Sequence, residues 1–201
     1  MLLLLTSLAV TVDGSKVREF EDAEQFYDWL AENHDSADEL WIKIHKVGSG
    51  LKSIIPKDAI DVVLCWGWID GIRKGFDQKS YLQRYTPRRP KSVWSQINVA
   101  NVARLIAEGR MTEHGLKHVE AAKADGRWDR AYPGSRDMKL PDDLRSAVEA
   151  NKAALVTFAR LTAQNRFALA IRVMNLRSEA ARKRKIGELV ALLERGETRF
   201  Q

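Results

Sequence analysis

The chain has 201 residues and a net charge of +6, and 45% of its residues are hydrophobic while 30% are charged. This composition, with 12 Gly and 5 Pro, excludes an intrinsically disordered or collagen-like chain. The single cysteine, Cys65, excludes a disulfide framework and a cysteine-based zinc site. No apolar run reaches the length of about 18 residues that predicts a transmembrane helix. The positive charge favours anionic partners such as nucleic acid, nucleotides or anionic lipid.

The segment from Leu2 to Val12 carries no charge. A secretory signal has a basic start, whereas the first lysine here is Lys16, so we interpret the segment as a strand, with export as the alternative. Asp13-Gly14 after it is typical of a hairpin turn. We expect a cytoplasmic protein.

The first half of the chain alternates helical and extended patterns. Asp22 and Gln25 form a capping box before a helix, and residues 40–44 read as a strand. A helix should begin at Pro56, and because Asp61 is the only charge from Ala59 to Ile69, it should be apolar on nearly every side; Gly71 should end it. The pattern of residues 72–84 predicts a ribbon or two short strands. Two further helices start at Ser95 and Thr112.

From Leu140 onward the pattern is entirely helical. Helices should begin near Pro141 and Asn151, a third should carry residues 167–173, and Ser178 should cap a fourth. The predicted fold class is therefore α+β. A small N-terminal antiparallel sheet with helices should occupy residues 1–135, and an all-helical domain residues 140–196.

The strongest chemical signal is a basic segment between Gly71 and Trp94. Seven basic residues and one acid, Asp77, give it a charge of 7 − 1 = +6, with Tyr81 and Tyr85 among the cations and Trp94 at the end. Arginine beside an aromatic ring is suited to binding a phosphate while the ring stacks on a base. The alternative is a solvated basic ribbon. The predicted ligand-binding residues are Arg84, Arg88, Arg89, Lys91, Trp94 and Trp68.

The Trp-Gly-Trp motif at 66–68 is followed two residues later by Asp70, which we consider a candidate general base at the rim of a pocket. The alternative is that both tryptophans are core residues and that Asp70 pairs with an arginine. Cys65 in an apolar helix should be a buried, unreactive thiol. His114 and His118 have i, i+4 spacing without the acidic residue of a zinc-protease motif, so we predict no metal site. No phosphate-binding glycine motif is present, and we predict no cofactor.

Four sequence motifs resemble those of the YdeI/OmpD-associated family, also called the bacteriocin-protection family. They are LCWGWIDG at 64–71, YLQRYTPRRPKS at 81–92, AEGRMTEHGL at 107–116 and DGRWDRAY at 125–132. The resemblance implies a bacterial stress or envelope-defence protein with a C-terminal helical domain, and it implies no particular reaction. The tail at 175–186 departs from the family's pattern.

Three functions remain open on the sequence alone. The first is a protein that binds an anionic small molecule or an acidic protein surface through the basic loop at 84–94. The second is an enzyme with Asp70 as base and the arginines as an anion clamp. The third is a nucleic-acid-binding protein, supported by charge and aromatic residues but by no known motif.

Overall fold

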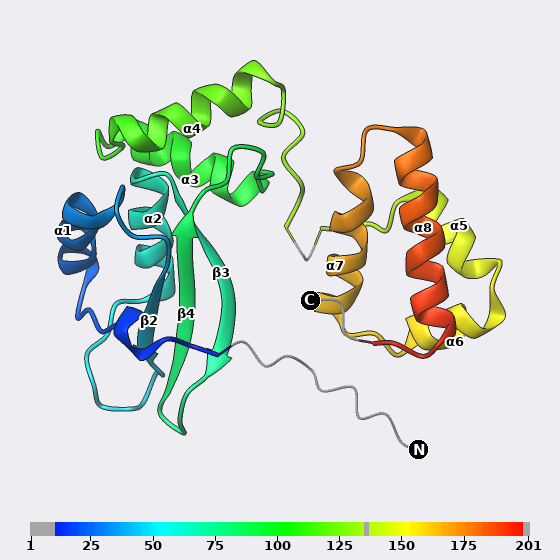
Figure 1. Ribbon diagram of the computed structural model, residues 1–201, viewed down its shortest axis with the longest axis horizontal. Coiled ribbons are helices and arrows are strands. Elements are labelled where there is room, and N and C mark those ends of the chain that lie inside the picture. Colours follow the sequence, from blue (N-terminus) through cyan, green and yellow to red (C-terminus); the bar gives the residue numbers. More distant parts are fainter. Residues whose placement is uncertain (1–10, 135–136, 199–201) are drawn as a thin grey trace. The chain divides into compact units, whose positions relative to one another are not determined.

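The computed structural model of the chain describes residues 11–134 and 137–198 (Figure 1). They form two compact units, one of residues 11–92 and 101–124 and the other of residues 93–100 and 125–198. The α+β class is confirmed, because the sheet lies in the N-terminal half and the chain from Asp142 on is helical. The predicted domain border between 135 and 140 stays a prediction.

The first unit is built on a four-stranded sheet with the order β1-β2-β4-β3. Its strands are β1 (Val17–Arg18), β2 (Leu40–His45), β3 (Trp68–Gly75) and β4 (Ser80–Pro87). β4 pairs antiparallel with both of its neighbours, whereas β1 pairs parallel with β2. The sheet is therefore mixed at one edge rather than purely antiparallel as predicted. A helix connects β1 to β2, and such a crossover is the connection that parallel pairing requires.

Helices α1 (Ala23–Asn33) and α2 (Pro56–Cys65) pack beside the sheet (Figure 1). The Asp22 carboxylate accepts a hydrogen bond from the Gln25 N–H at 3.0 Å, and the Gln25 side chain accepts one from the Glu21 N–H, which confirms the predicted capping box. The core between these helices and the sheet is apolar and fully buried. It includes Phe26, Leu30, Leu40, Ile42, Ile44, Val62, Val63, Trp68 and Tyr85.

The end of α2 differs from the sequence prediction. The helix ends at Cys65, and Trp68 is already the first residue of β3, so the predicted helix through Ile69 is wrong. Gly67 has a φ of +71°, the left-handed conformation in which a glycine commonly ends a helix. The tryptophans therefore lie in a tight turn and on a strand, and Gly71 lies inside β3 instead of ending a helix.

Two helices follow the sheet, α3 (Gln96–Ala107) and α4 (Glu113–Ala124). Both predicted caps are confirmed, because Ser95 Oγ accepts from the Asn98 N–H at 3.1 Å and Thr112 Oγ1 accepts from the Gly115 N–H at 3.3 Å. Thr112 also donates its hydroxyl to the Cys65 carbonyl at 2.6 Å, which ties the start of α4 to the end of α2.

The second unit packs four helices around its own core. They are α5 (Asp142–Glu149), α6 (Lys152–Ala159), α7 (Ala163–Met174) and α8 (Glu179–Glu194). The side chains of Asn151 and Ser178 cap α6 and α8 as predicted. Leu155, which the sequence pattern placed in the core, is 41% exposed, because the short α6 turns Ala154 and Thr157 inward instead. The buried residues are Leu144, Val148, Ala154, Leu161, Leu169, Val173, Ile186, Leu189 and Leu193.

The N-terminal prediction is mostly untested, because residues 1–10 lie outside the described part of the chain. Asp13 does not form the expected hairpin turn. Its carboxylate accepts from the Ser15 N–H at 2.9 Å and caps a short 3₁₀ helix, η1 (Gly14–Lys16), that leads into β1. No helix among the residues that the structure describes has the length and apolar character needed to cross a membrane.

Candidate functional site

The predicted anion-binding arginines lie at the end of β4 and on the loop after it. Arg84 forms an ion pair with Glu39, whose Oε2 accepts from Nε at 2.6 Å. Glu39 precedes β2 and is 45 positions away in the sequence, so the spacing of the basic segment gave no indication of it. Arg88 is only 3% exposed. Of the four predicted cations, Arg84 is therefore paired with a carboxylate and Arg88 is buried.

The other two cations, Arg89 and Lys91, lie on an exposed turn. The Ser92 N–H donates to the Arg89 carbonyl at 2.9 Å, which closes a turn with Pro90 at its second position. The turn is anchored at its start, because the Arg88 N–H donates to the Gly67 carbonyl at 2.9 Å. Neither Arg89 nor Lys91 forms an ion pair with any described residue. The stiff loop expected from the prolines is thus fixed by two hydrogen bonds as well.

The tryptophans predicted as stacking partners are buried. Trp68 is 1% exposed, and its Nε1 donates to the His34 carbonyl at 3.2 Å. Trp94 is 2% exposed in the second unit, where its ring meets the edge of Trp128. Both side chains are therefore packed in the protein interior, and their predicted role as stacking partners of a ligand stays a prediction.

Asp70 lies on β3 opposite Tyr85, at the start of a register shift that extends to Arg73. The residue keeps solvent access, yet the atoms packed around its carboxyl group raise its pKa, and the charges of Arg88 and Arg73 oppose that rise. Burial also raises the pKa of the Cys65 thiol, to about 11. A thiol that is buried and protonated at neutral pH is unreactive, as the sequence predicted.

The structure brings together an aromatic cluster that the sequence did not suggest. Trp66 contacts Tyr27, His34 and His114, with ring centroids 5.2, 4.7 and 5.8 Å away. His34 Nε2 lies 3.1 Å from both ring nitrogens of His114 and 3.2 Å from Asp35 Oδ2. The two histidines are 80 positions apart in the sequence. The i, i+4 spacing suggested His118 as the partner of His114, whereas the structure places His34 beside it.

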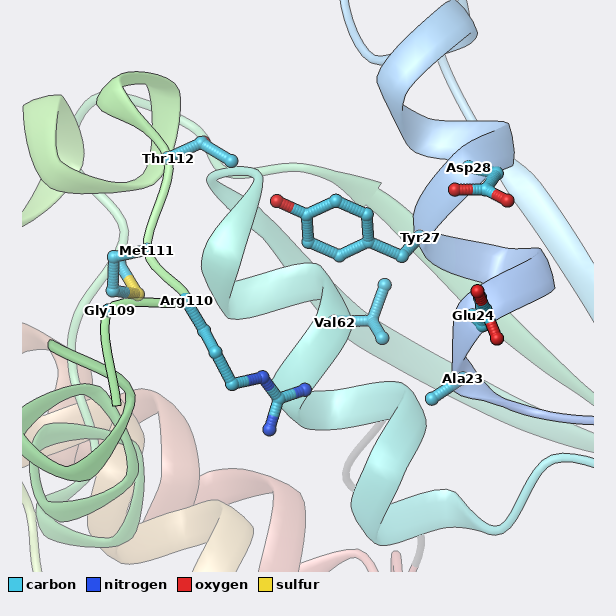
Figure 2. Close-up of a pocket in the computed structure, with 9 residues that line it drawn as sticks. All are labelled: Ala23, Glu24, Tyr27, Asp28, Val62, Gly109, Arg110, Met111 and Thr112. Carbon is cyan, nitrogen blue, oxygen red and sulfur yellow. The ribbon is translucent and has the colours of Figure 1, made fainter. Parts of the chain in front are cut away.

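A cavity of about 740 Å³ opens next to this cluster within the first unit (Figure 2). Figure 2 shows the Tyr27 ring extending from α1, with its hydroxyl group directed toward the loop that carries Thr112. The lining combines carboxylates on α1 with a guanidinium group on the loop. The lining residues are Ala23, Glu24, Tyr27, Asp28, Val62, Gly109, Arg110, Met111 and Thr112.

Comparison with known families accounts for most of the chain. Residues 18–118, half of the chain, match the family described as a domain of unknown function, DUF8412. The chain belongs to the DUF8412 family. Residues 137–196 match a second family, described as "Bacteriocin-protection, YdeI or OmpD-Associated", and this confirms the resemblance drawn from the sequence. No curated protein and no solved structure matches the chain.

The two matches follow the division of the chain into α+β and helical regions. The DUF8412 match contains the sheet, α1, α2, the cavity and the Trp66 cluster, whereas the YdeI/OmpD-associated match contains helices α5 to α8. The phrases at 64–71, 81–92 and 107–116 lie in the DUF8412 region. The candidate sites of this DUF8412 protein therefore belong to the region whose family has no assigned function.

Proposed function

We propose that this DUF8412 protein is a bacteriocin-protection-like defence protein that binds an anionic ligand or partner at the turn from Arg88 to Ser92. The observation that carries the proposal is the pair of exposed cations, Arg89 and Lys91, on a turn held by hydrogen bonds at both ends. Their two charges lie within three residues and have no acidic partner among the described side chains. An anion bound there would relieve their mutual repulsion.

Rigidity favours binding at this turn. Pro90 restricts the backbone between the two cations, and a loop that is already ordered loses little conformational entropy when a ligand binds. The guanidinium group of Arg89 offers a planar pair of donors for a phosphate or carboxylate, and Lys91 adds a point charge. The net charge of +6 attracts an anion from a distance.

Thermal-shift measurements with four anions test the proposal: inorganic phosphate, a nucleotide, a single-stranded oligonucleotide and a polyglutamate peptide. We expect at least one to raise the melting temperature of the wild-type chain. The double variant R89A/K91A should lose that response, because each charged hydrogen bond contributes about 1.5–3 kcal/mol, or at least tenfold in affinity.

The matched control is K57A/K117A, which removes two exposed lysines from α2 and α4 and leaves the turn intact. It should respond to the anion as the wild type does. An equal loss in both double variants would mean that only the overall charge matters, and no response of the wild type to any anion would reject the site. A response to the oligonucleotide alone would identify the anionic partner as a nucleic acid.

Asp70 supports a second candidate function, that of an enzyme. A carboxyl group whose pKa is raised by its packing and which lies near the charges of Arg88 and Arg73 has the environment of a general base. A panel of chromogenic esters and phosphoesters tests this function. The Asp70→Asn variant should lose turnover, while Asp77→Asn, an exposed control on the same hairpin, should keep it. No turnover by the wild type, or equal rates in both variants, would reject Asp70 as a base.

A further inference from the structure

His34, Asp35 and His114 place three ligand-type atoms in one spot of the first unit. One nitrogen or oxygen atom from each residue lies within 4.8 Å of the other two. His34 caps the end of α1, Asp35 follows it, and His114 lies in the first turn of α4. Asp35 and His114 are exposed, so an ion from solution can reach the cluster.

Hydrogen bonding determines which nitrogen of His34 carries its proton. His34 Nδ1 lies 3.0 Å from the Leu30 carbonyl, and a carbonyl oxygen only accepts, so Nδ1 is the donor. In the neutral ring, Nε2 then holds a lone pair. That lone pair faces the Asp35 carboxylate at 3.2 Å and the His114 ring at 3.1 Å. A lone pair beside a carboxylate offers two ligand atoms that a single metal ion can bind.

We propose that this cluster binds a divalent transition-metal ion, with Zn²⁺ as its probe, through His34 Nε2, one ring nitrogen of His114 and one oxygen of Asp35. Zinc binds histidine and carboxylate ligands at about 2.0–2.2 Å in a tetrahedron, so neighbouring ligand atoms lie roughly 3.3 Å apart. The separations of 3.1 and 3.2 Å around His34 are close to that value. Three protein ligands leave the fourth position open to water or to a ligand.

The surroundings orient the proposed ligands. The Leu30 carbonyl acts on His34 as the outer partner that metal-bound histidines usually have, since it fixes the tautomer and the plane of the ring. Trp66 stacks on His114 with an angle of 27° between the ring planes and also contacts His34. Trp66 also contacts Tyr27, which lines the cavity of about 740 Å³. Trp66 therefore connects the proposed metal ligands to one residue of the cavity lining.

Isothermal titration calorimetry of the full, untagged and chelator-treated chain with ZnSO₄ tests the proposal directly. We expect one zinc ion per chain. His114→Ala should weaken binding by at least about tenfold, since losing even an outer partner of a ligand costs that much. Asp35→Asn should weaken it while leaving the fold unchanged, because the side chain is exposed. The matched control is His45→Ala, which removes a histidine that pairs with Glu19 at 3.0 Å, and it should bind zinc as the wild type does.

Two further readouts decide the outcome. Co²⁺ in place of zinc should give the absorption bands of a tetrahedral ion, and these bands should disappear in Asp35→Asn and His114→Ala. Zinc should also raise the melting temperature of the wild type but not of the two ligand variants. If the wild type takes up no zinc, the proposal is wrong. Equal weakening in His45→Ala and His114→Ala would also overturn it.

Discussion

Replacing Gly115 by alanine should separate α4 from the end of α2. A Cβ atom at this position would lie 2.3 Å from the carbonyl oxygen of Cys65 and 2.7 Å from that of Leu64. Both neighbours are backbone atoms at the end of α2, so neither can move aside without moving the helix. The same contact surface carries two hydrogen bonds to the Cys65 carbonyl, from the Thr112 hydroxyl at 2.6 Å and the Thr112 N–H at 3.2 Å.

The size of the effect follows from these contacts. Inserting a methyl group into a closely packed contact costs about 1–3 kcal/mol. Loss of the two hydrogen bonds of Thr112 adds about 0.5–1.5 kcal/mol each. Alanine regains at most roughly 1 kcal/mol over glycine, the value for a helix interior, because Gly115 lies in the first turn of α4. The free energy of unfolding should therefore fall by about 3 kcal/mol in Gly115→Ala.

Urea denaturation followed by tryptophan fluorescence measures this loss, because four of the six tryptophans lie in the first unit. The control is Gly187→Ala in α8, where nothing lies within 4 Å of the added Cβ. That variant should be stabilised by about 0.5–1 kcal/mol from helix propensity alone. A Gly115→Ala chain as stable as the wild type would refute the close approach of α2 and α4 on which the His34–His114 pair depends.

Three further results are expected. Cys65, buried and with its pKa raised to about 11, should react with a thiol reagent far more slowly in the native chain than in guanidinium chloride, and equal rates would mean that the thiol is accessible. Asp61 is 4% exposed and accepts two hydrogen bonds from Arg104 Nη2, at 2.6 and 2.7 Å. The Asp61→Ala substitution should therefore lower the urea midpoint much more than Asp77→Ala, which removes an exposed carboxylate. The hydrogen bond from Arg182 lowers the pKa of Asp143 in the folded chain. The ionised carboxylate therefore stabilises the fold fully above the unfolded-state pKa of about 3.9, and this contribution is lost as the pH falls through the lower folded-state pKa. The difference in urea midpoint between wild type and Asp143→Asn should accordingly shrink below about pH 4, and a constant difference would contradict this assignment.

Local signals in the sequence predicted the elements of both units well. The caps at Asp22, Ser95, Asn151 and Ser178 each lie at the start of a helix, because a cap is an interaction between residues three positions apart. The sequence also predicted the buried thiol of Cys65 from the apolar residues around it. The end of α2 was misplaced, since an apolar run continues unchanged from a buried helix into a buried strand and gives no sign of where one becomes the other.

The sequence by itself determined the fold class, most of the helix starts, the family resemblance and the basic turn with its prolines. Only the tertiary structure decided which charged and titratable groups meet. Glu39 reaches Arg84 across 45 positions, Arg104 reaches Asp61 across 43, and His114 reaches His34 across 80. Such pairs form because the packing of α1, α2, α3, α4 and the sheet brings distant segments together, and the residue spacing within one element carries no information about that packing. For this reason the sequence identified the exposed cations on the turn but not the histidine cluster.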